Sequence, residues 1–297
     1  MKRLLSCYAS DIKNMSSKDL KQAILASEGR IILGETVVTS APLLEGVTNA
    51  EVMCAFGADM VLLNEFDVFK KKINGMKYED NPIKKIKELV GRPVGINLEP
   101  VDYDASLLEE KINLSSGRLA TVNTFCEAEN LGVDFICLTG NPATGVSNES
   151  INNSIEIAKK HYSGLIFAGK MHGAGVSEKL LDEKIILSFI ENGADGILIP
   201  AASTVPGVNE TLLTDIINKI KEKNALVMCA IGTSQESSDE ETIKLIGLSN
   251  KRVGADIHHI GDGGYGRMPI PENIMALSIA VRGKRHTYFK MTQSVNR

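Results

Sequence analysis

Five polar residues stand just beyond short apolar runs, where a parallel sheet would gather them around one site. Glutamates follow the first three runs, and the fifth run, "LIFAG", is followed by "KMH". A lysine and a histidine beside carboxylates can move a proton next to a carbonyl and stabilise the enolate that forms. The candidate catalytic residues are therefore Glu35, Glu65, Glu99, Lys170 and His172.

Lys170 is central to this expectation, because a cation would balance both the carboxylates and an anionic substrate. We expect enolate stabilisation rather than a Schiff base, since neighbouring carboxylates raise the pKa of a lysine. The alternative is a structural salt bridge to Glu35 or Glu99. Glu65 and Glu99 are also the candidate ligands of Mg²⁺, with FMN the less favoured cofactor. Polar residues at other run ends complete the predicted pocket: Asn64, Asn97, Asn141 and His259.

The stretch "DIHHIGDGGYGRMP", residues 256–269, raises the question of what a glycine-rich turn does there. Gly261, Gly263 and Gly266 fit the dinucleotide fingerprint G-x-G-x-x-G. That fingerprint needs an acidic residue about 20 positions further on. The chain instead reads "VRGKRH" near 281–286, so the sequence disfavours dinucleotide binding.

Two other interpretations of this turn involve phosphate. "IGDG" is similar to the last motif of haloacid dehalogenase phosphatases, and "VDYDAS" to their nucleophile motif, which predicts Asp102, Asp104 and Asp262 around one Mg²⁺. In many barrels, however, the loops after strands seven and eight bind phosphate. We favour this clamp over tight turns that merely need positive φ. Its expected residues are Gly232, Thr233, Ser234, Gly263, Gly264 and Arg267.

A repeated pattern indicates the elements that position these residues. A glycine ends an amphipathic stretch, an aspartate follows, and an apolar strand begins. The segments are "FGADMVLLNE", "LGVDFICLTG", "NGADGILIPA" and "VGADIHHIGD". We expect their aspartates to be structural, because barrel chemistry lies at the other ends of the strands. These aspartates are Asp59, Asp134, Asp195 and Asp256.

Strands of this kind start about 27 to 40 residues apart, which leaves room for one helix and two loops each time. The chain therefore predicts an α/β protein, a (β/α)₈ TIM barrel in one domain over residues 1–297. "SSKDLKQAILASEG" predicts an extra N-terminal helix that closes the barrel floor, and an open doubly wound sheet is the alternative. The strands are expected near 31–35, 58–64, 93–98, 133–138, 164–169, 195–199, 225–231 and 254–260.

Composition excludes several classes of function. A net charge of −4 argues against a nucleic-acid binder, and no apolar run approaches the length of a membrane span. The first residues lack the apolar core of a secretory signal, and the five cysteines form no C-x-x-C pair. We therefore expect a cytoplasmic protein with a small-molecule ligand and no nucleic-acid or membrane partner. Whether the protein forms a homo-oligomer stays open.

The whole chain resembles a bacterial family of barrel proteins without established activity, some of which carry a dehalogenase-like label. Residues 231–235 and 260–267 resemble the phosphate loops of phosphosugar- and FMN-binding barrels. These resemblances transfer no catalytic residues, but they imply a phosphorylated ligand such as a sugar phosphate or phosphorylated keto acid. The expected chemistry is that of an isomerase, epimerase or lyase. A dehalogenase-like phosphatase and a non-catalytic phosphate-ligand-binding barrel are the alternatives.

Overall fold

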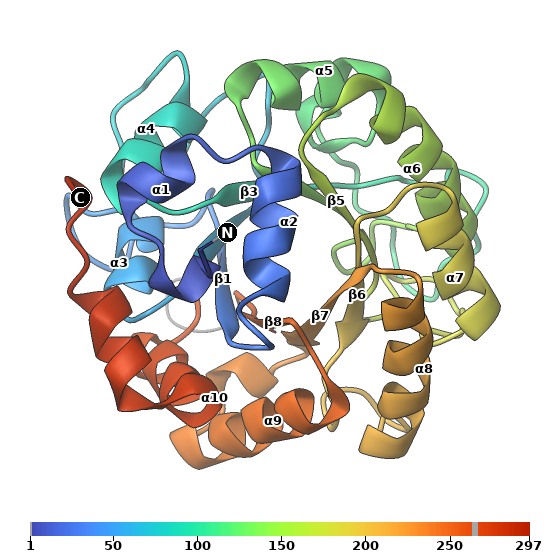
Figure 1. The fold of residues 1–297 in the computed structure, drawn as a ribbon. Helices are drawn as coiled ribbons and strands as arrows, with labels where there is room; N and C mark the ends of the chain where they lie inside the picture. Colours follow the sequence, from blue (N-terminus) through green and yellow to red (C-terminus); the bar gives the residue numbers. More distant parts are fainter. Residues whose placement is uncertain (1, 263–266) are drawn as a thin grey trace.

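Eight parallel strands close into a barrel in the computed structural model, which describes residues 2–262 and 267–297 (Figure 1). The strands follow one another around the barrel in chain order, and β8 pairs with β1 through Ile257 and Ile31. This closure confirms the TIM barrel and excludes the open sheet. The strands are β1 (Ile31–Val37), β2 (Met60–Asn64), β3 (Val94–Leu98), β4 (Phe135–Leu138), β5 (Leu165–Gly169), β6 (Gly196–Pro200), β7 (Leu226–Ile231) and β8 (Ile257–Ile260).

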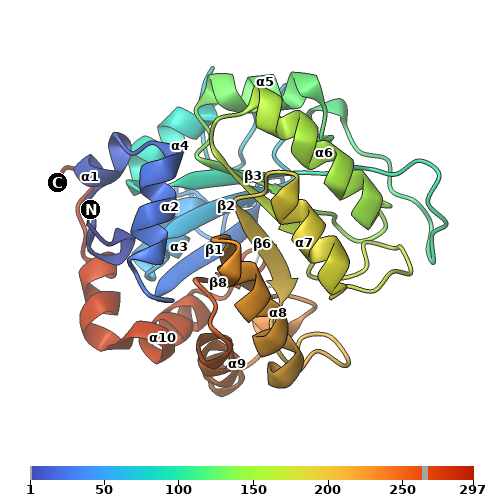
Figure 2. The same ribbon diagram turned by 45° about the vertical axis from the view of Figure 1, so that its right-hand side comes forward.

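A helix follows each strand and packs on the outside of the barrel (Figures 1 and 2). Within the described residues, none of the helices combines the length and apolarity that a membrane crossing requires. The outer helices are α3 (Asn49–Ala55), α4 (Pro82–Val90), α5 (Val122–Leu131), α6 (Asn148–His161), α7 (Glu183–Glu191), α8 (Glu210–Glu222), α9 (Glu240–Val253) and α10 (Pro271–Met291). Short 3₁₀ turns in the described part of the chain include η1 (Leu4–Ser6), η2 (Ser116–Arg118) and η3 (Gln235–Ser237).

The N-terminal segment covers one end of the barrel, as the sequence predicts. Helices α1 (Ala9–Lys13) and α2 (Ser17–Leu25) lie across the opening seen in Figure 1. Ser16 caps α2 by accepting a hydrogen bond from the Asp19 backbone N–H. Leu20 and Ile24 are buried in the same apolar cluster as Ile31, which begins β1. The cluster closes the end of the barrel where the strands begin and leaves the opposite mouth open.

The recurring aspartates join successive strands. Each accepts a hydrogen bond on Oδ2 from the backbone N–H of a residue at the start of the preceding strand, at 2.8 to 3.2 Å. Each also donates its own backbone N–H to that strand. Such bonds satisfy backbone groups that burial would otherwise leave unpaired. The structural role predicted for this position is therefore confirmed. The pairs are Asp59 with Ile32, Asp134 with Val94, Asp195 with Ile166, and Asp256 with Val227.

Side chains alternate along each strand between the barrel interior and the helix layer. In β2, Leu62 belongs to the interior cluster, whereas Val61 and Leu63 pack in the cluster under the helices. In β8 the same alternation turns His259 toward Glu35 of β1, while the neighbouring His258 contacts the Gly29 carbonyl oxygen. This parity decides which strand-end residues reach the open mouth.

Candidate active site

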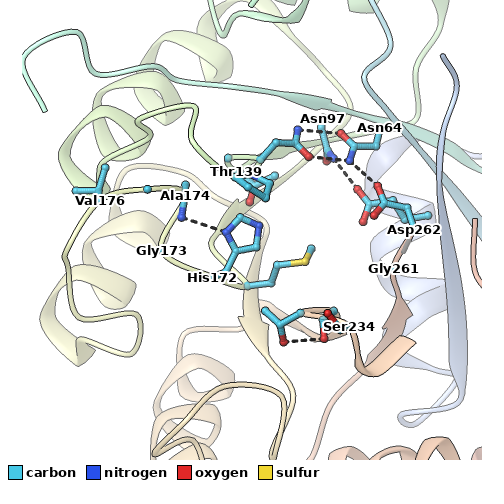
Figure 3. Close-up of a pocket in the computed structure, with 18 of the residues that line it drawn as sticks. Asn64, Asn97, Thr139, His172, Gly173, Ala174, Val176, Ser234, Gly261 and Asp262 are labelled. Carbon is cyan, nitrogen blue, oxygen red and sulfur yellow. Dashed lines mark hydrogen bonds between the residues drawn. The ribbon is translucent and has the colours of Figure 1, made fainter. Parts of the chain in front are cut away.

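A cavity of about 500 Å³ lies at the carboxyl ends of the strands (Figure 3). Polar side chains, several of them from strand ends around the barrel, make up about half of its lining residues. No lysine or arginine belongs to the lining over the described ranges 2–262 and 267–297. The polar residues of the lining include Glu35, Asn64, Asn97, Glu109, Thr139, Asn141, His172, Thr233, Ser234, Glu236 and Asp262.

Glu35 holds a central position at the floor of this cavity. It follows the inward-facing Leu33 by two positions on β1 and is 2% exposed. Both of its carboxylate oxygens accept hydrogen bonds, one from Nδ2 of Asn97 at 2.6 Å and one from Nε2 of His259 at 2.8 Å. An ionised carboxylate only accepts, so Nε2 of His259 carries the hydrogen. The sequence predicts all three residues in the pocket, and the structure brings them together.

Hydrogen bonds between two asparagines, Asn64 and Asn141, connect the cavity wall next to Glu35 with Asp262. The side-chain amides of Asn64 and Asn141 exchange hydrogen bonds of 2.9 and 3.0 Å. Nδ2 of Asn64 also donates to Oδ2 of Asp262 at 2.7 Å, a contact drawn in Figure 3. Behind them, Glu99 accepts from both the backbone N–H and Nδ2 of Asn141, each at 2.9 Å, and from Arg118 at 2.7 Å.

The carboxyl group of Asp262 has a pKa well above its ordinary value. Burial, and after it the negative charge of Glu35, raise the pKa of Asp262 from 3.8 to about 7. The hydrogen bond from Asn64 and the electrostatic effects of His259 and Arg267 act in the opposite direction. A carboxyl group that titrates near neutral pH can both accept and donate a proton during a reaction.

His172 extends into the cavity from the loop after β5 (Figure 3). Its Nδ1 accepts a hydrogen bond from the Ala174 backbone N–H at 3.0 Å. Burial lowers the pKa of His172, although Glu35 acts against this shift. A neutral imidazole whose Nδ1 accepts must carry its hydrogen on Nε2. His172 therefore offers an N–H donor to a ligand.

Glu65 and Glu99, the predicted metal ligands, do not line the cavity. Glu99 is 1% exposed and pairs with Arg118. Glu65 accepts from the Thr39 hydroxyl and lies 3.5 Å from Arg267. Because arginines balance both carboxylates, this pair does not provide the free charge that Mg²⁺ requires. Among the residues described, no group of three or more His, Cys, Asp or Glu side chains is arranged to hold a metal ion.

The expectation for Lys170 requires correction, since its amine does not point into the cavity. Nζ donates to the Val146 carbonyl oxygen at 3.1 Å and to Glu178 at 2.6 Å. The reason is strand parity. Phe167 of β5 faces the interior and Ala168 faces the helices, so Lys170 falls on the outer side with Ala168. The salt bridge predicted as the alternative exists, with Glu178 in place of Glu35 or Glu99.

The loop after β7 forms a tight turn on the cavity wall. Thr233 and Ser234 have φ values of 54° and 78°, and the Thr233 hydroxyl donates to the Thr204 carbonyl oxygen. Glu236 is buried beside them. Burial raises the pKa of Glu236, while its own backbone N–H and that of Ser234 lower it. These backbone N–H groups therefore interact with the carboxyl group of Glu236, at the place where the predicted clamp would hold a phosphate.

Of the remaining residues of the predicted clamp, the structure describes Arg267. Gly263 and Gly264 lie outside the described residues. The side chain of Arg267 is 63% exposed and is directed to Glu65 rather than to Gly232. Gly232–Ser234 therefore line the cavity wall. Within the described chain, no lysine or arginine joins them in the lining.

The dehalogenase-like arrangement is not formed. Asp102 lies in the loop after β3, where its side chain accepts the Asp104 backbone N–H at 3.0 Å. Neither residue lines the cavity that Asp262 lines.

Four polar lining residues were missing from the predicted pocket: Glu109, Thr139, Glu236 and Asp262. Asp262 appears in the sequence only within the dehalogenase-like motif, although it lies just two residues beyond the end of β8. Thr139 directly follows β4, and only its place at a strand end could have indicated it. Glu236 stands five residues after the end of β7. No periodic signal marks a residue that far into a loop.

Comparisons with known proteins agree with the fold. No curated protein matches the sequence. The crystal structure of 2,3-dimethylmalate lyase, a PEP mutase/isocitrate lyase superfamily member, matches with a TM-score of 0.52 and 10% identity over 86% of this chain and 81% of that one. An archaeal fructose 1,6-bisphosphate aldolase matches with a TM-score of 0.53 and 16% identity over 89% of this chain and 100% of that one. At these identities the similarity concerns the barrel alone. Over residues 5–297 the sequence matches the family described as "Domain of unknown function (DUF7916)", and the chain belongs to that family.

Proposed function

We propose that this barrel is an enzyme that removes a proton next to a carbonyl group of a small substrate, in the class of lyases or isomerases. The observation that carries the proposal is Asp262, a cavity-facing carboxyl group whose pKa lies at about 7. A general base is most effective when its pKa is near the working pH, because the ionised form is then both populated and basic.

Glu35 supports this role without being the proton acceptor itself. Its two oxygens are occupied by Asn97 and His259, so its charge is held in place beside Asp262. Two nearby carboxylates resist being ionised together, which keeps the proton affinity of Asp262 high. The proton taken from the substrate carbon would go to Asp262, and the same group could return it to a product.

His172 supplies the second requirement of this chemistry. Removal of a proton next to a carbonyl leaves negative charge on the carbonyl oxygen, which a fixed donor stabilises. The Nε2–H of His172 is such a donor, and Ala174 fixes the tautomer. His172 thus takes the enolate-stabilising role that the sequence assigned to Lys170.

The proposed substrate is a small oxo compound, with oxo acids and sugar phosphates as the classes to compare. The lyase and the aldolase among the structural neighbours are compatible with this proposal at the level of the fold. Phosphate binding at Gly232–Ser234 remains part of the proposal, although Glu236 lies beside those residues. A phosphorylated substrate is therefore compared with its unphosphorylated counterpart.

The experiment is a hydrogen-exchange screen that does not require knowledge of the complete reaction. Oxo acids and sugars, each with and without a phosphate, are incubated with the protein in D₂O, with and without Mg²⁺. Proton NMR then detects loss of the signal from the C–H next to the carbonyl. The proposal predicts enzyme-dependent exchange for one class of compound. Compounds that bind in a thermal-shift assay but never exchange would contradict it and favour a non-catalytic binder.

A further inference from the structure

A continuous series of hydrogen bonds runs from a largely buried arginine, Arg118, to the proposed base. It passes from Arg118 through Glu99, Asn141 and Asn64 to Asp262, with donor–acceptor distances of 2.7 to 3.0 Å. The members come from η2 and from the ends of β2, β3, β4 and β8. The series therefore joins four strand ends and terminates on the group that the proposed function uses.

The direction of these hydrogen bonds is set at the Glu99 end. A side-chain amide offers N–H donors on one side and an oxygen acceptor on the other, so turning it over exchanges the two roles. Glu99 forms an ion pair with Arg118, and a carboxylate only accepts hydrogen bonds. Asn141 must consequently direct Nδ2 toward Glu99, and its Oδ1 is left to accept from Asn64.

Asn64 transmits this direction to the base. Its Oδ1 accepts from Nδ2 of Asn141 and from the Glu65 backbone N–H at 2.8 Å, while its Nδ2 faces Asn141 and Asp262. If the amide were turned over, its oxygen would face the Asp262 carboxylate. Two acceptors cannot share a hydrogen bond, so Asp262 would have to hold a proton of its own.

We propose that Glu99 is a positioning residue whose charge orients the amides of Asn141 and Asn64 so that Asp262 receives an N–H and stays able to accept a proton. This inference rests on the proposed role of Asp262 as the base. It assigns Glu99 a task through its neighbours rather than in contact with a substrate or a metal.

Glu99→Gln tests this inference, because it changes the pKa of Asp262 in two opposite ways: it removes a negative charge, and it removes the group that orients the amides. Loss of a negative charge would by itself lower the pKa of Asp262. Loss of the oriented N–H would raise it, since a donor stabilises the ionised carboxyl. The other charged groups that face Asp262 are Glu35 from β1, His259 from β8 and Arg267 beyond β8, and this substitution leaves them in place.

The measurement is a ¹³C NMR titration of protein labelled at the aspartate side-chain carboxyl, with Asp262→Asn used for assignment. We expect Glu99→Gln to raise the Asp262 pKa by about one unit, the order expected for a hydrogen bond to a charged group. Asn64→Leu should raise it at least as much. The matched control is Glu65→Gln, which also removes a carboxylate near Arg118 but lies outside the series; it should produce no rise.

The outcomes separate this inference from the proposed function. An Asp262 that titrates near 4 in the unchanged protein would contradict the proposed function itself. A value near 7 that rises in Asn64→Leu but falls or stays constant in Glu99→Gln would overturn only the positioning role. If Glu99→Gln does not fold, Asn141→Leu interrupts the same series and should give the same rise; no rise there would overturn the inference.

Discussion

Nδ2 of Asn64 donates a 2.7 Å hydrogen bond to Oδ2 of Asp262, across 198 positions of sequence. Closure of the barrel brings these residues together, because Asn64 ends β2 and Asp262 follows β8, on either side of β1. The contact favours the ionised carboxyl, whereas burial and Glu35 favour the protonated one. The balance places Asp262 where a general base works best.

Replacing Asp262 by asparagine should make the protein more stable at alkaline pH. The raised pKa means that the folded state holds a proton between about pH 4 and pH 7 that the unfolded state has released. Stability from this group is therefore full below pH 4 and is lost as the pH rises to 7. We expect Asp262→Asn to gain about 1–3 kcal/mol at pH 8.5 and little at pH 4 in urea unfolding. Equal changes at both pH values would contradict the raised pKa.

His172 should be neutral, with its hydrogen on Nε2, throughout the neutral range. Because burial lowers its pKa, protonation should begin only below the ordinary value of 6.5. Long-range ¹⁵N NMR on histidine-labelled protein reports each ring nitrogen, and five histidines keep the spectrum simple. His172→Phe assigns the signals and should slow exchange of a substrate by about 10²-fold. A hydrogen found on Nδ1 would contradict the proposed donor.

Lys170 should matter for stability and not for the chemistry. Lys170→Met leaves the Glu178 carboxylate and the Val146 carbonyl without their shared donor, so unfolding should become easier by about 1–3 kcal/mol. Combining Lys170→Met with Glu178→Leu should recover part of that loss. Borohydride reduction in the presence of an oxo acid, followed by peptide mapping, should find no adduct on Lys170. A covalent adduct there would return Lys170 to the active site.

The aspartates at the strand starts should respond to substitution according to whether an oxygen acceptor remains. Asp256→Ala removes the partner of the Val227 backbone N–H and should cost about 1–3 kcal/mol of stability. Asp256→Asn keeps an oxygen for that N–H and is the matched control, with a smaller loss expected. Both variants should retain the exchange activity, because Asp256 lies at the other end of β8 from Asp262. Equal losses of stability in the two variants would contradict this account.

The fold could be predicted because each strand–helix unit repeats the same local signals. Every predicted strand coincides with an observed one to within a few residues, and local signals such as the capping box of Thr48 and Glu51 begin the helices between them. The helix α2 that closes the barrel floor was recognisable from the stretch "SSKDLKQAILASEG". These features depend on neighbours in sequence, so one chain is enough to reveal them.

The site was predicted less completely, because it depends on side-chain parity and on loops. Parity applied to β5 would have placed Lys170 outside, as it placed His259 inside. Glu99 faces the series of amides behind the cavity, a position that its strand end alone does not reveal. Asp262 lies beyond the last residue of β8, where no alternation determines a direction. Its raised pKa depends on Glu35, a residue at the opposite end of the chain.

The most direct test of the central claim compares the unchanged protein with Asp262→Asn in the deuterium-exchange assay, using whichever oxo compound exchanges. If Asp262 removes the proton, exchange should fall by at least about 10²-fold while binding of the compound, followed by thermal shift, is retained. Glu109→Gln, which changes another carboxylate of the cavity lining, is the matched control and should exchange normally. Undiminished exchange in Asp262→Asn would contradict the assignment of Asp262 as the base.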